Sequence, residues 1–277
     1  MTQPSNKPSM ENPQDERFST HQNFYDYYAE QSTSPETVQR FAAIHDMMAR
    51  VAQGRGLAGA KLDVLDIGCG AGTQSMMWAQ DGHRVHGIDI NGPLVELART
   101  RGTGAGFDID YRIGTAAQLP WADASMDICL VPELLEHVAE WQSCIAELTR
   151  VLKPGGLLYL STNNALCPVQ QEFNLPLYSW YPRRLKRHYE RLAVTTRPEL
   201  ANYAKYPAVN WFTFYELRAY LAQRNFRALD RFDVADTALG GKRAMLFGAI
   251  RALPPLRWLA HVATPYTMLV AVKGERR

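Results

Sequence analysis

A chain of 277 residues with 46% hydrophobic composition is long enough to bury one sizeable core, or one domain that carries a cap. Its formal net charge of +2 gives no bulk electrostatic argument for nucleic acid, so we expect no nucleic-acid partner. Cys69, Cys129, Cys144 and Cys167 form no C-x-x-C pair, which argues against zinc clusters and disulfide frameworks and favours reduced thiols in the cytoplasm.

The first segment, residues 1–20, is polar and contains prolines, so we predict a disordered leader rather than a signal peptide. No later segment approaches the roughly 18 consecutive apolar residues of a membrane-spanning helix. We therefore expect a cytoplasmic protein, and a peripheral contact with the inner face of a membrane is left open. Two helical stretches, residues 24–32 and 35–52, follow the leader.

From residue 62 onward, short apolar runs alternate with helical segments. This alternation predicts a doubly wound, mostly parallel α/β sheet of seven strands, with its ligand at the carboxyl ends of the strands. The predicted strands are residues 62–67, 84–90, 109–114, 126–131, 157–162, 227–235 and 266–273, and the predicted helices are residues 73–80, 93–101, 141–152 and 213–226.

Two segments interrupt this rhythm and are too long for ordinary connections. The first, residues 163–210, is rich in aromatic residues, proline and arginine, and we predict a helical cap insertion there. The second insertion, residues 236–265, separates the last two strands. Between the insertions, Thr213 and Glu216 fit a capping box at the start of a helix.

The stretch VLDIGCGAGTQ, residues 64–74, predicts a buried strand that ends in a ligand-binding turn. Its glycines, Gly68, Gly70 and Gly72, allow positive φ angles and close approach by a ligand. A helix beginning near Thr73 would point free N–H groups at that ligand. Asp89 ends the next strand about twenty residues later, where a carboxylate can bind both hydroxyls of a ribose. A tight turn without a ligand, and a helix N-cap at Asp89, are the plain structural alternatives.

A glycine turn followed by a distal acid fits either a nicotinamide cofactor or S-adenosylmethionine. In the dinucleotide pattern G-x-G-x-x-G, the last glycine would fall at Thr73, whereas this chain has Gly72 instead. Asp66 precedes the turn, where it would repel a pyrophosphate but could accept an ammonium group. S-adenosylmethionine is therefore favoured, and an NAD-dependent oxidoreductase and a catalytically silent cofactor-binding partner are remote alternatives.

Four segments in this order resemble the class I S-adenosylmethionine-dependent methyltransferases. VLDIGCGAG resembles their motif I, GIDIN their ribose-binding segment, IGTAAQLPWADASMDIC their adenine loop and fourth strand, and LTRVLKPGGLLYLST the following helix, turn and strand. The resemblance covers residues 62–162, and residues 211–277 weakly. It implies a Rossmann-like fold that uses S-adenosyl-L-methionine.

Residue by residue, the resemblance also implies a cofactor site. Many relatives have Asp where this chain has Thr115, so the adenine amino group is left to backbone atoms or to Gln118. The implied contacts are Asp66, Gly68 and Gly70 beside the methionine part, with Gly72 in the same turn, and Asp89 at the ribose. Around the adenine they are Ile90, Thr115, Ala116 and Ala117, and Val131 would lie beneath the sulfonium. Tyr25 and Tyr28 of the N-terminal helix would close over the cofactor, and plain helix packing is the alternative role for these two tyrosines.

The predicted organisation is therefore a leader, a pair of covering helices and one catalytic domain. Residues 21–60 would form N-terminal helices that cover the cofactor site. Residues 61–277 would form the methyltransferase domain, with the cap at 163–210 and the second insertion at 236–265.

Candidate catalytic residues follow the fourth strand in VPELLEHVAEW. The E-x-x-E-H spacing of Glu133, Glu136 and His137 also resembles that of ubiquinone-type O-methyltransferases. His137 is the preferred base for deprotonating a hydroxyl, because an ordinary imidazole titrates near neutrality. The alternative is that Glu136 and His137 only fix the loop or cap a helix. A divalent ion held by the three side chains is not favoured, because no fourth ligand is evident, and we predict no metal site.

The acceptor is predicted from the insertions. Aromatic residues of the cap suit a hydrophobic or phenolic molecule, and Arg183, Arg184, Lys186 and Arg187 could meet an anionic group on it. A solvated helical cap with an aromatic core is the plain alternative. The second insertion mixes apolar and basic residues, which fits a membrane surface, a lid or a dimer contact. We expect O-methylation of a small hydrophobic, phenolic or lipid-linked acceptor; methylation of a glycan or glycolipid sugar, or of carbon, is the alternative, and no oligomeric state is predicted.

Overall fold

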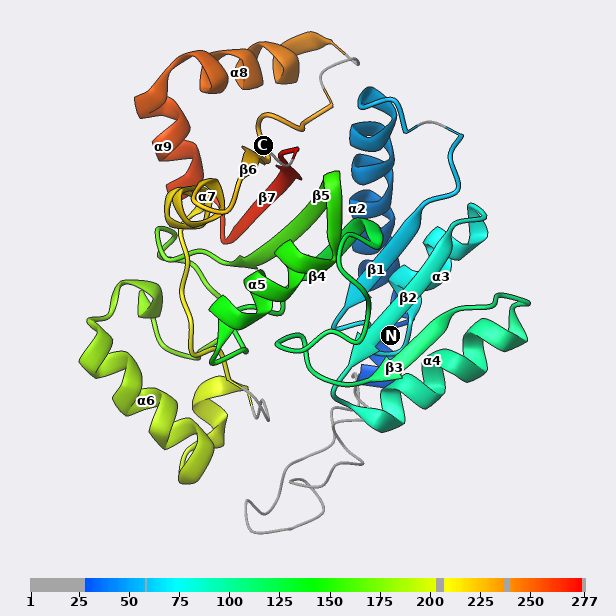
Figure 1. The fold of residues 1–277 in the computed structure, drawn as a ribbon. Coiled ribbons are helices and arrows are strands. Elements are labelled where there is room, and N and C mark those ends of the chain that lie inside the picture. The colour runs from blue at the N-terminus through cyan, green and yellow to red at the C-terminus, as the bar shows by residue number, and fades with distance from the viewer. Residues whose placement is uncertain (1–27, 58, 203–206, 237–239, 276–277) are drawn as a thin grey trace, which may run out of the picture.

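The computed structural model describes residues 28–57, 59–202, 207–236 and 240–275 (Figure 1). The predicted leader and Tyr25 lie outside these residues. One seven-stranded sheet has the order β3-β2-β1-β4-β5-β7-β6, and its neighbours are parallel except where β7 runs antiparallel to β5 and β6. The predicted fold class is confirmed. The strands are β1 (Asp63–Ile67), β2 (Arg84–Asp89), β3 (Asp110–Ile113), β4 (Met126–Pro132), β5 (Leu152–Asn163), β6 (Phe226–Asp230) and β7 (Tyr266–Lys273).

Helices cover both faces of the sheet, as alternating side chains on its strands require. On one face, Leu65 and Ile67 pack with α5 (Trp141–Val151) and α7 (Phe214–Ala222). On the other face, Val64 packs with α2 (Pro35–Gly54) and α3 (Thr73–Gln80). The helix α4 (Gly92–Gly104) follows β2 and packs beside β3. The central strands are covered by helices on both faces, which explains their nearly continuous apolar character.

Two strand boundaries differ from the prediction by more than one residue. β5 begins at Leu152 rather than at residue 157, because Met126 pairs with Leu152 before the register shifts. Lys153 supports this early start, since its Nζ lies 3.0 Å from Asp63 and 2.8 Å from Asp127. β6 ends at Asp230 rather than at residue 235, because the chain turns there.

The insertions carry helices of their own. Residues 163–210 contain η2 (Tyr178–Trp180), α6 (Arg183–Thr195) and η3 (Pro198–Ala201), which share a separate cluster around Tyr178. Residues 236–265 contain α8 (Gly241–Ala252) and α9 (Pro254–Val262), which extend beyond β6 and β7 (Figure 1). The boundaries proposed for these units stay predictions. None of the described helices combines the length and apolar character needed to cross a bilayer.

A buried carboxylate ties α9 to the sheet. Asp230 is fully buried at the end of β6, where it accepts hydrogen bonds from Arg257 Nε at 2.7 Å and from the backbone amides of Phe232 and Asp233. His261 Nε2 lies 2.9 Å from the same carboxylate. Burial raises the pKa of Asp230, but the hydrogen bonds from His261 and Arg257 outweigh it and bring the pKa to about 2.

This depressed pKa predicts a stabilisation that is present above about pH 4 and is lost as the pH falls toward 2. Asp230→Asn should reduce the free energy of unfolding by about 3 kcal/mol at pH 7, because Arg257 and His261 lose their buried anion. It should also remove about 2 kcal/mol of the acid-dependent loss between pH 4 and 2. Urea titrations at several pH values measure both effects. Asp123→Asn, which breaks the exposed pair with Arg150, is the control and should change stability little; equal acid sensitivity of native and D230N chains would contradict the assignment.

Candidate active site

The glycine turn leaves the carboxyl end of β1 and leads into α3. Gly68, Gly70 and Gly72 have φ angles of +75°, +49° and +81°, as predicted. A Cβ at Gly72 would lie 2.3 Å from Tyr111 Oη and 2.9 Å from Ala98 Cβ, so a side chain does not fit there. A Cβ at Gly70 would meet no atom within 4 Å of the described protein. Gly72 is therefore required by packing, whereas Gly70 leaves space for a ligand against the backbone.

Asp89 joins this turn to the end of β2. Its carboxylate accepts hydrogen bonds from the Gly70 amide at 3.0 Å and from the Asn91 amide at 2.8 Å. The N-cap of α4 is Asn91, whose side chain accepts from the Leu94 amide, so Asp89 is not the helix cap. Burial raises the pKa of Asp89. Because each oxygen accepts one of these bonds, the carboxylate retains lone pairs for a ligand.

Buried polar groups flank the glycine turn, with Asp66 on β1 before it and Gln74 and Ser75 in the first turn of α3 after it. Asp66 is buried and accepts a hydrogen bond of 2.6 Å from Ser75 Oγ, and burial raises its pKa to about 6. Gln74, which sequence reasoning missed, is also buried, and neither atom of its side-chain amide has a hydrogen-bond partner among the described residues. Buried amides are normally paired, so Gln74 marks a place where a polar ligand group would be stabilising.

Apolar side chains stand open at the ends of the neighbouring strands. Ile90 and Ile113 follow β2 and end β3, and they are 59% and 56% exposed. Beyond them, Thr115 is exposed and its Oγ1 accepts from the Ala117 amide at 3.2 Å, while Ala116 is buried. Exposed isoleucines beside an acidic strand end suit a flat ring attached to a sugar. Sequence reasoning identified Ile90 but not Ile113.

The chain that precedes α2 lies beside the glycine turn. Thr73 Oγ1 donates to the Ser32 carbonyl at 2.7 Å, and Arg101 donates to Ser32 Oγ at 2.8 Å. Tyr28 lies in the short helical segment just before, with an exposed side chain. Val131, by contrast, is fully buried near the end of β4. These positions agree with a cofactor role for the segment and for Val131, but that role stays a prediction.

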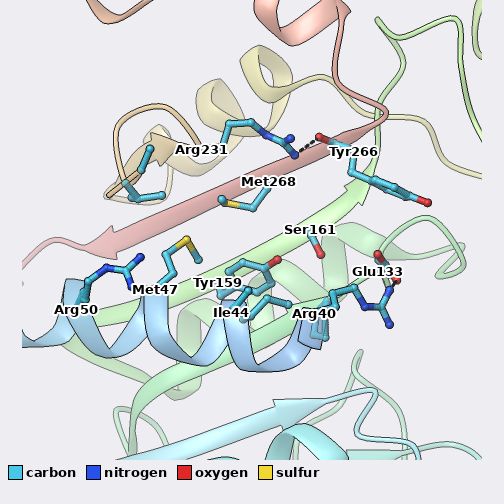
Figure 2. A pocket seen from close by; sticks show the side chains of 14 residues that line it. Arg40, Ile44, Met47, Arg50, Glu133, Tyr159, Ser161, Arg231, Tyr266 and Met268 are labelled. Atoms are coloured by element: carbon cyan, nitrogen blue, oxygen red, sulfur yellow. Dashed lines mark hydrogen bonds and ion pairs between the residues drawn. The ribbon is translucent and has the colours of Figure 1, made fainter. Parts of the chain in front are cut away.

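Among the candidate catalytic residues after β4, Glu133 and Glu136 have different side-chain partners. Glu133 has a φ of +49°, and its carboxylate pairs with Arg40 of α2 (Figure 2). Glu136 is buried and accepts a hydrogen bond of 2.8 Å from Thr162 Oγ1, and burial raises its pKa to about 8. His137 is half-buried, with its backbone amide bonded to the Leu134 carbonyl. Within the described ranges, no three His, Cys, Asp or Glu side chains are arranged to bind a metal ion.

Further groups at this edge come from distant parts of the chain. Glu172 of the cap lies near Glu133, and burial together with that charge raises the pKa of Glu172 to about 7. Tyr266, which begins β7, donates from its hydroxyl to Gln171 Oε1 at 3.0 Å. Arg40 of α2, which pairs with Glu133, also lies at this edge. No local pattern marks these residues, because their proximity arises only from the packing of α2, the cap and β7.

The cap uses part of its predicted recognition residues for its own packing, whereas Arg183, Arg184 and Arg187 are exposed. Phe173 and Tyr178 stack with ring centroids 4.1 Å apart. Lys186 is buried, donates to the Ser179 carbonyl at 2.8 Å and lies 4.3 Å from the Trp211 ring centroid. The expectation that Lys186 could meet a substrate anion is therefore wrong for this conformation, because its ammonium is already enclosed.

The chain is similar in sequence to known methyltransferases. Residues 65–160 match a family model described as a methyltransferase domain. A ubiquinone biosynthesis O-methyltransferase of Brucella anthropi is 33% identical over 179 residues, 62% of this chain and 63% of that protein. Another of the same name, from Sinorhizobium fredii, is 40% identical over 103 residues, 37% of this chain and 42% of that protein. The chain thus spans less than two thirds of the length of these relatives.

A solved structure shows the same fold. It is a SAM-dependent methyltransferase from Aquifex aeolicus, with a TM-score of 0.53 and 15% identity, and the match covers 90% of this chain and 97% of that one.

The two glycines predict a contrast in stability. Gly72→Ala should lower the free energy of unfolding by more than about 2 kcal/mol, because the methyl group meets Tyr111 and Ala98 and the backbone is left-handed. Gly70→Ala adds only backbone strain, about 1 kcal/mol. Urea unfolding followed by circular dichroism compares the two variants. Equal losses would show that the crowding at Gly72 is relieved by movement of its neighbours.

The raised pKa of Glu136 predicts a pH dependence of stability opposite in sign to that caused by Asp230. Its folded-state pKa of about 8 lies above the ordinary value of 4.5, so stability is full below about pH 4.5 and is lost as the pH rises through 8. Glu136→Gln keeps an acceptor for Thr162 but cannot ionise. Its stability relative to the native chain should therefore rise by about 2 kcal/mol or more between pH 5 and 8. Denaturation midpoints across this range test the effect, with exposed Glu140→Gln as the control; a pH-independent difference would refute it.

Proposed function

We propose that this chain is a class I S-adenosylmethionine-dependent methyltransferase that transfers a methyl group to a hydroxyl of a small hydrophobic, phenolic or lipid-linked acceptor. The proposal is supported by the methyltransferase-domain match over residues 65–160 and by relatives that are named O-methyltransferases. The observation that carries the proposal is the Gly70–Asp89 hydrogen bond, which holds an open stretch of backbone next to a carboxylate. The acceptor class is suggested by the curated relatives, which are named for ubiquinone biosynthesis.

The described residues fit S-adenosylmethionine. The space at Gly70 and the buried carboxylate of Asp66 would receive the methionine part, Asp89 the ribose hydroxyls, and Ile90 with Ile113 the adenine ring. When bound, the cofactor supplies an electrophilic methyl group on a sulfonium. The protein then has to align an acceptor oxygen, exclude water and accept a proton.

We assign His137 as the base that accepts the proton from the hydroxyl of the acceptor. Glu136, with a pKa of about 8, is mostly protonated at neutral pH and stays bonded to Thr162, so it serves to hold the loop. Glu133 is paired with Arg40 and is less available as a base. His137 is half-buried in the same turn, close to the end of β4 where the methyl group would be presented.

A peripheral membrane contact, which a lipid-linked acceptor would favour, is proposed for the surface of α8 and α9. Met245, Leu246, Trp258 and Leu259 are exposed there. Two nearby arginines are unsuited to lipid headgroups, because Arg257 pairs with Asp230 and Asp233 and Arg251 bonds to backbone carbonyls. The apolar side chains are therefore the basis of this proposal.

The direct test is incubation of the purified chain with radiolabelled S-adenosylmethionine and a cell extract. We expect the label in an organic-soluble small molecule that releases no methanol on mild base treatment, as an aryl ether would behave. Label in protein or nucleic acid would contradict the small-molecule assignment, and label on a sugar or a carbon atom would favour the alternative acceptors.

His137→Ala tests the base. Turnover should fall at least about 100-fold, because a general base contributes that much to deprotonating a hydroxyl. Affinity for S-adenosylmethionine, measured by calorimetry, should be retained. The control is His188→Ala, whose imidazole is exposed on α6. Unchanged turnover in H137A would exclude the role.

A further inference from the structure

A cavity lies along the α2 face of the sheet, and one end of it is lined by Glu133 and Tyr266 of the candidate active site. It has a volume of about 520 Å³ and lies between α2 and strands β5 and β7 (Figure 2). Its walls include Ile44 and Met47 of α2, Val234, and Met268 of β7. We call it the α2 groove. Its volume is within the usual range for small-molecule sites, and most of its wall is apolar.

One cation faces this groove without an ionic partner. Arg231 follows β6 and points toward the groove (Figure 2), where its Nη2 donates to the backbone carbonyl of Tyr266 at 2.6 Å. No carboxylate within the described ranges forms an ion pair with Arg231. Burial lowers its pKa. A guanidinium has five N–H donors, so a largely buried one that makes a single bond to a neutral carbonyl is poorly compensated.

The other two arginines of the groove differ in this respect. Arg40 at one end pairs with Glu133, and Arg50 at the other end lies 4.0 Å from Asp236. The described lining thus leaves one positive charge to be neutralised. A single guanidinium matches a monovalent carboxylate in charge and in bidentate geometry, whereas a phosphate dianion would call for more than one cation.

The length of the groove suits an alkyl chain. Arg40 and Arg50 stand ten positions apart on one helix, which corresponds to about 15 Å along α2. The side chains of Ile44 and Met47 lie between them, across from Met268 (Figure 2). An extended hydrocarbon placed there would be removed from water along its length.

We propose that the α2 groove binds an amphipathic monocarboxylate, with its carboxylate on Arg231 and its hydrocarbon along α2. The carboxylate would supply the anion that Arg231 lacks, and the chain would cover the apolar wall. This site includes none of the residues assigned to S-adenosylmethionine and does not depend on the proposed methyl transfer, although its Glu133 end adjoins the candidate active site.

Calorimetry on the full chain tests the charge requirement. The probes are dodecanoate, dodecanol and dodecyl phosphate, each below its aggregation limit. We expect dodecanoate to bind at least about tenfold more tightly than dodecanol, because the charge-assisted hydrogen bonds are lost with the alcohol. Equal binding of these two would overturn the proposal. Dodecyl phosphate binding more tightly than dodecanoate would overturn the assignment to a monocarboxylate.

Variants locate the site. Arg231→Gln should weaken dodecanoate binding at least about tenfold and leave dodecanol unchanged. Arg227→Gln, an exposed arginine on β6, is the matched control and should bind as the native chain does. Ala43→Trp on the exposed mouth of the groove should block both probes while α2 stays folded. Native-like dodecanoate binding by R231Q or by A43W, with circular dichroism showing a folded protein, would exclude this groove as the site.

Discussion

The hydrogen bond from the Gly70 amide to the Asp89 carboxylate connects the turn after β1 to the end of β2, together with bonds from the Gly68 and Cys69 amides to the Ile88 carbonyl. These bonds hold a turn whose left-handed conformation needs glycine, and the turn leaves open space at Gly70. The packing around Gly72 adds the third strand, because Tyr111 of β3 occupies the place of a side chain there. Three strand ends are thereby fixed relative to one another. The cofactor assignment depends on this arrangement, since a ribose and an adenine ring must reach Asp89 and Ile90 together.

The other half of the sheet edge is governed by charge. Glu133, Glu136 and Glu172 lie close enough to influence one another, which would be unfavourable if all three were ionised. Arg40 neutralises the first, and burial raises the pKa of the other two to about 8 and about 7. The edge can therefore be acidic in composition and carry little net charge at neutral pH. An uncharged hydrophobic acceptor is compatible with such a site, whereas an anionic group would find a cation without an ion-pair partner at Arg231, among the described residues that line the α2 groove.

Local patterns in the sequence were sufficient for the elements that depend on local physics. The helix predicted at residues 73–80 matches α3, because a glycine turn and an apolar strand bound it, and the capping box of Thr213 and Glu216 forms as predicted. Local patterns did not predict strand ends and side-chain pairs that depend on residues distant in the sequence. Met126 extends β5 back to Leu152, and Asp230 ends β6 by collecting donors from α9 and the following turn. The Arg40–Glu133 pair joins residues 93 positions apart, so no spacing rule could have indicated it.

The difference between local pattern and tertiary packing also decides which residues are available to recognise an anionic group. From composition, the basic and aromatic cap is the natural place for an anionic or aromatic substrate, yet Tyr178 and Lys186 are enclosed in its own core. The Lys186 ammonium is bonded to the Ser179 carbonyl and lies over the Trp211 and Tyr178 rings, which leaves a ligand no access to it. Arg231 differs because it lines the α2 groove: nothing in its sequence context distinguishes it, but folding buries it beside an apolar wall with one backbone partner. Uncompensated burial, rather than the density of charged residues, is what makes a cation a candidate for binding an anion.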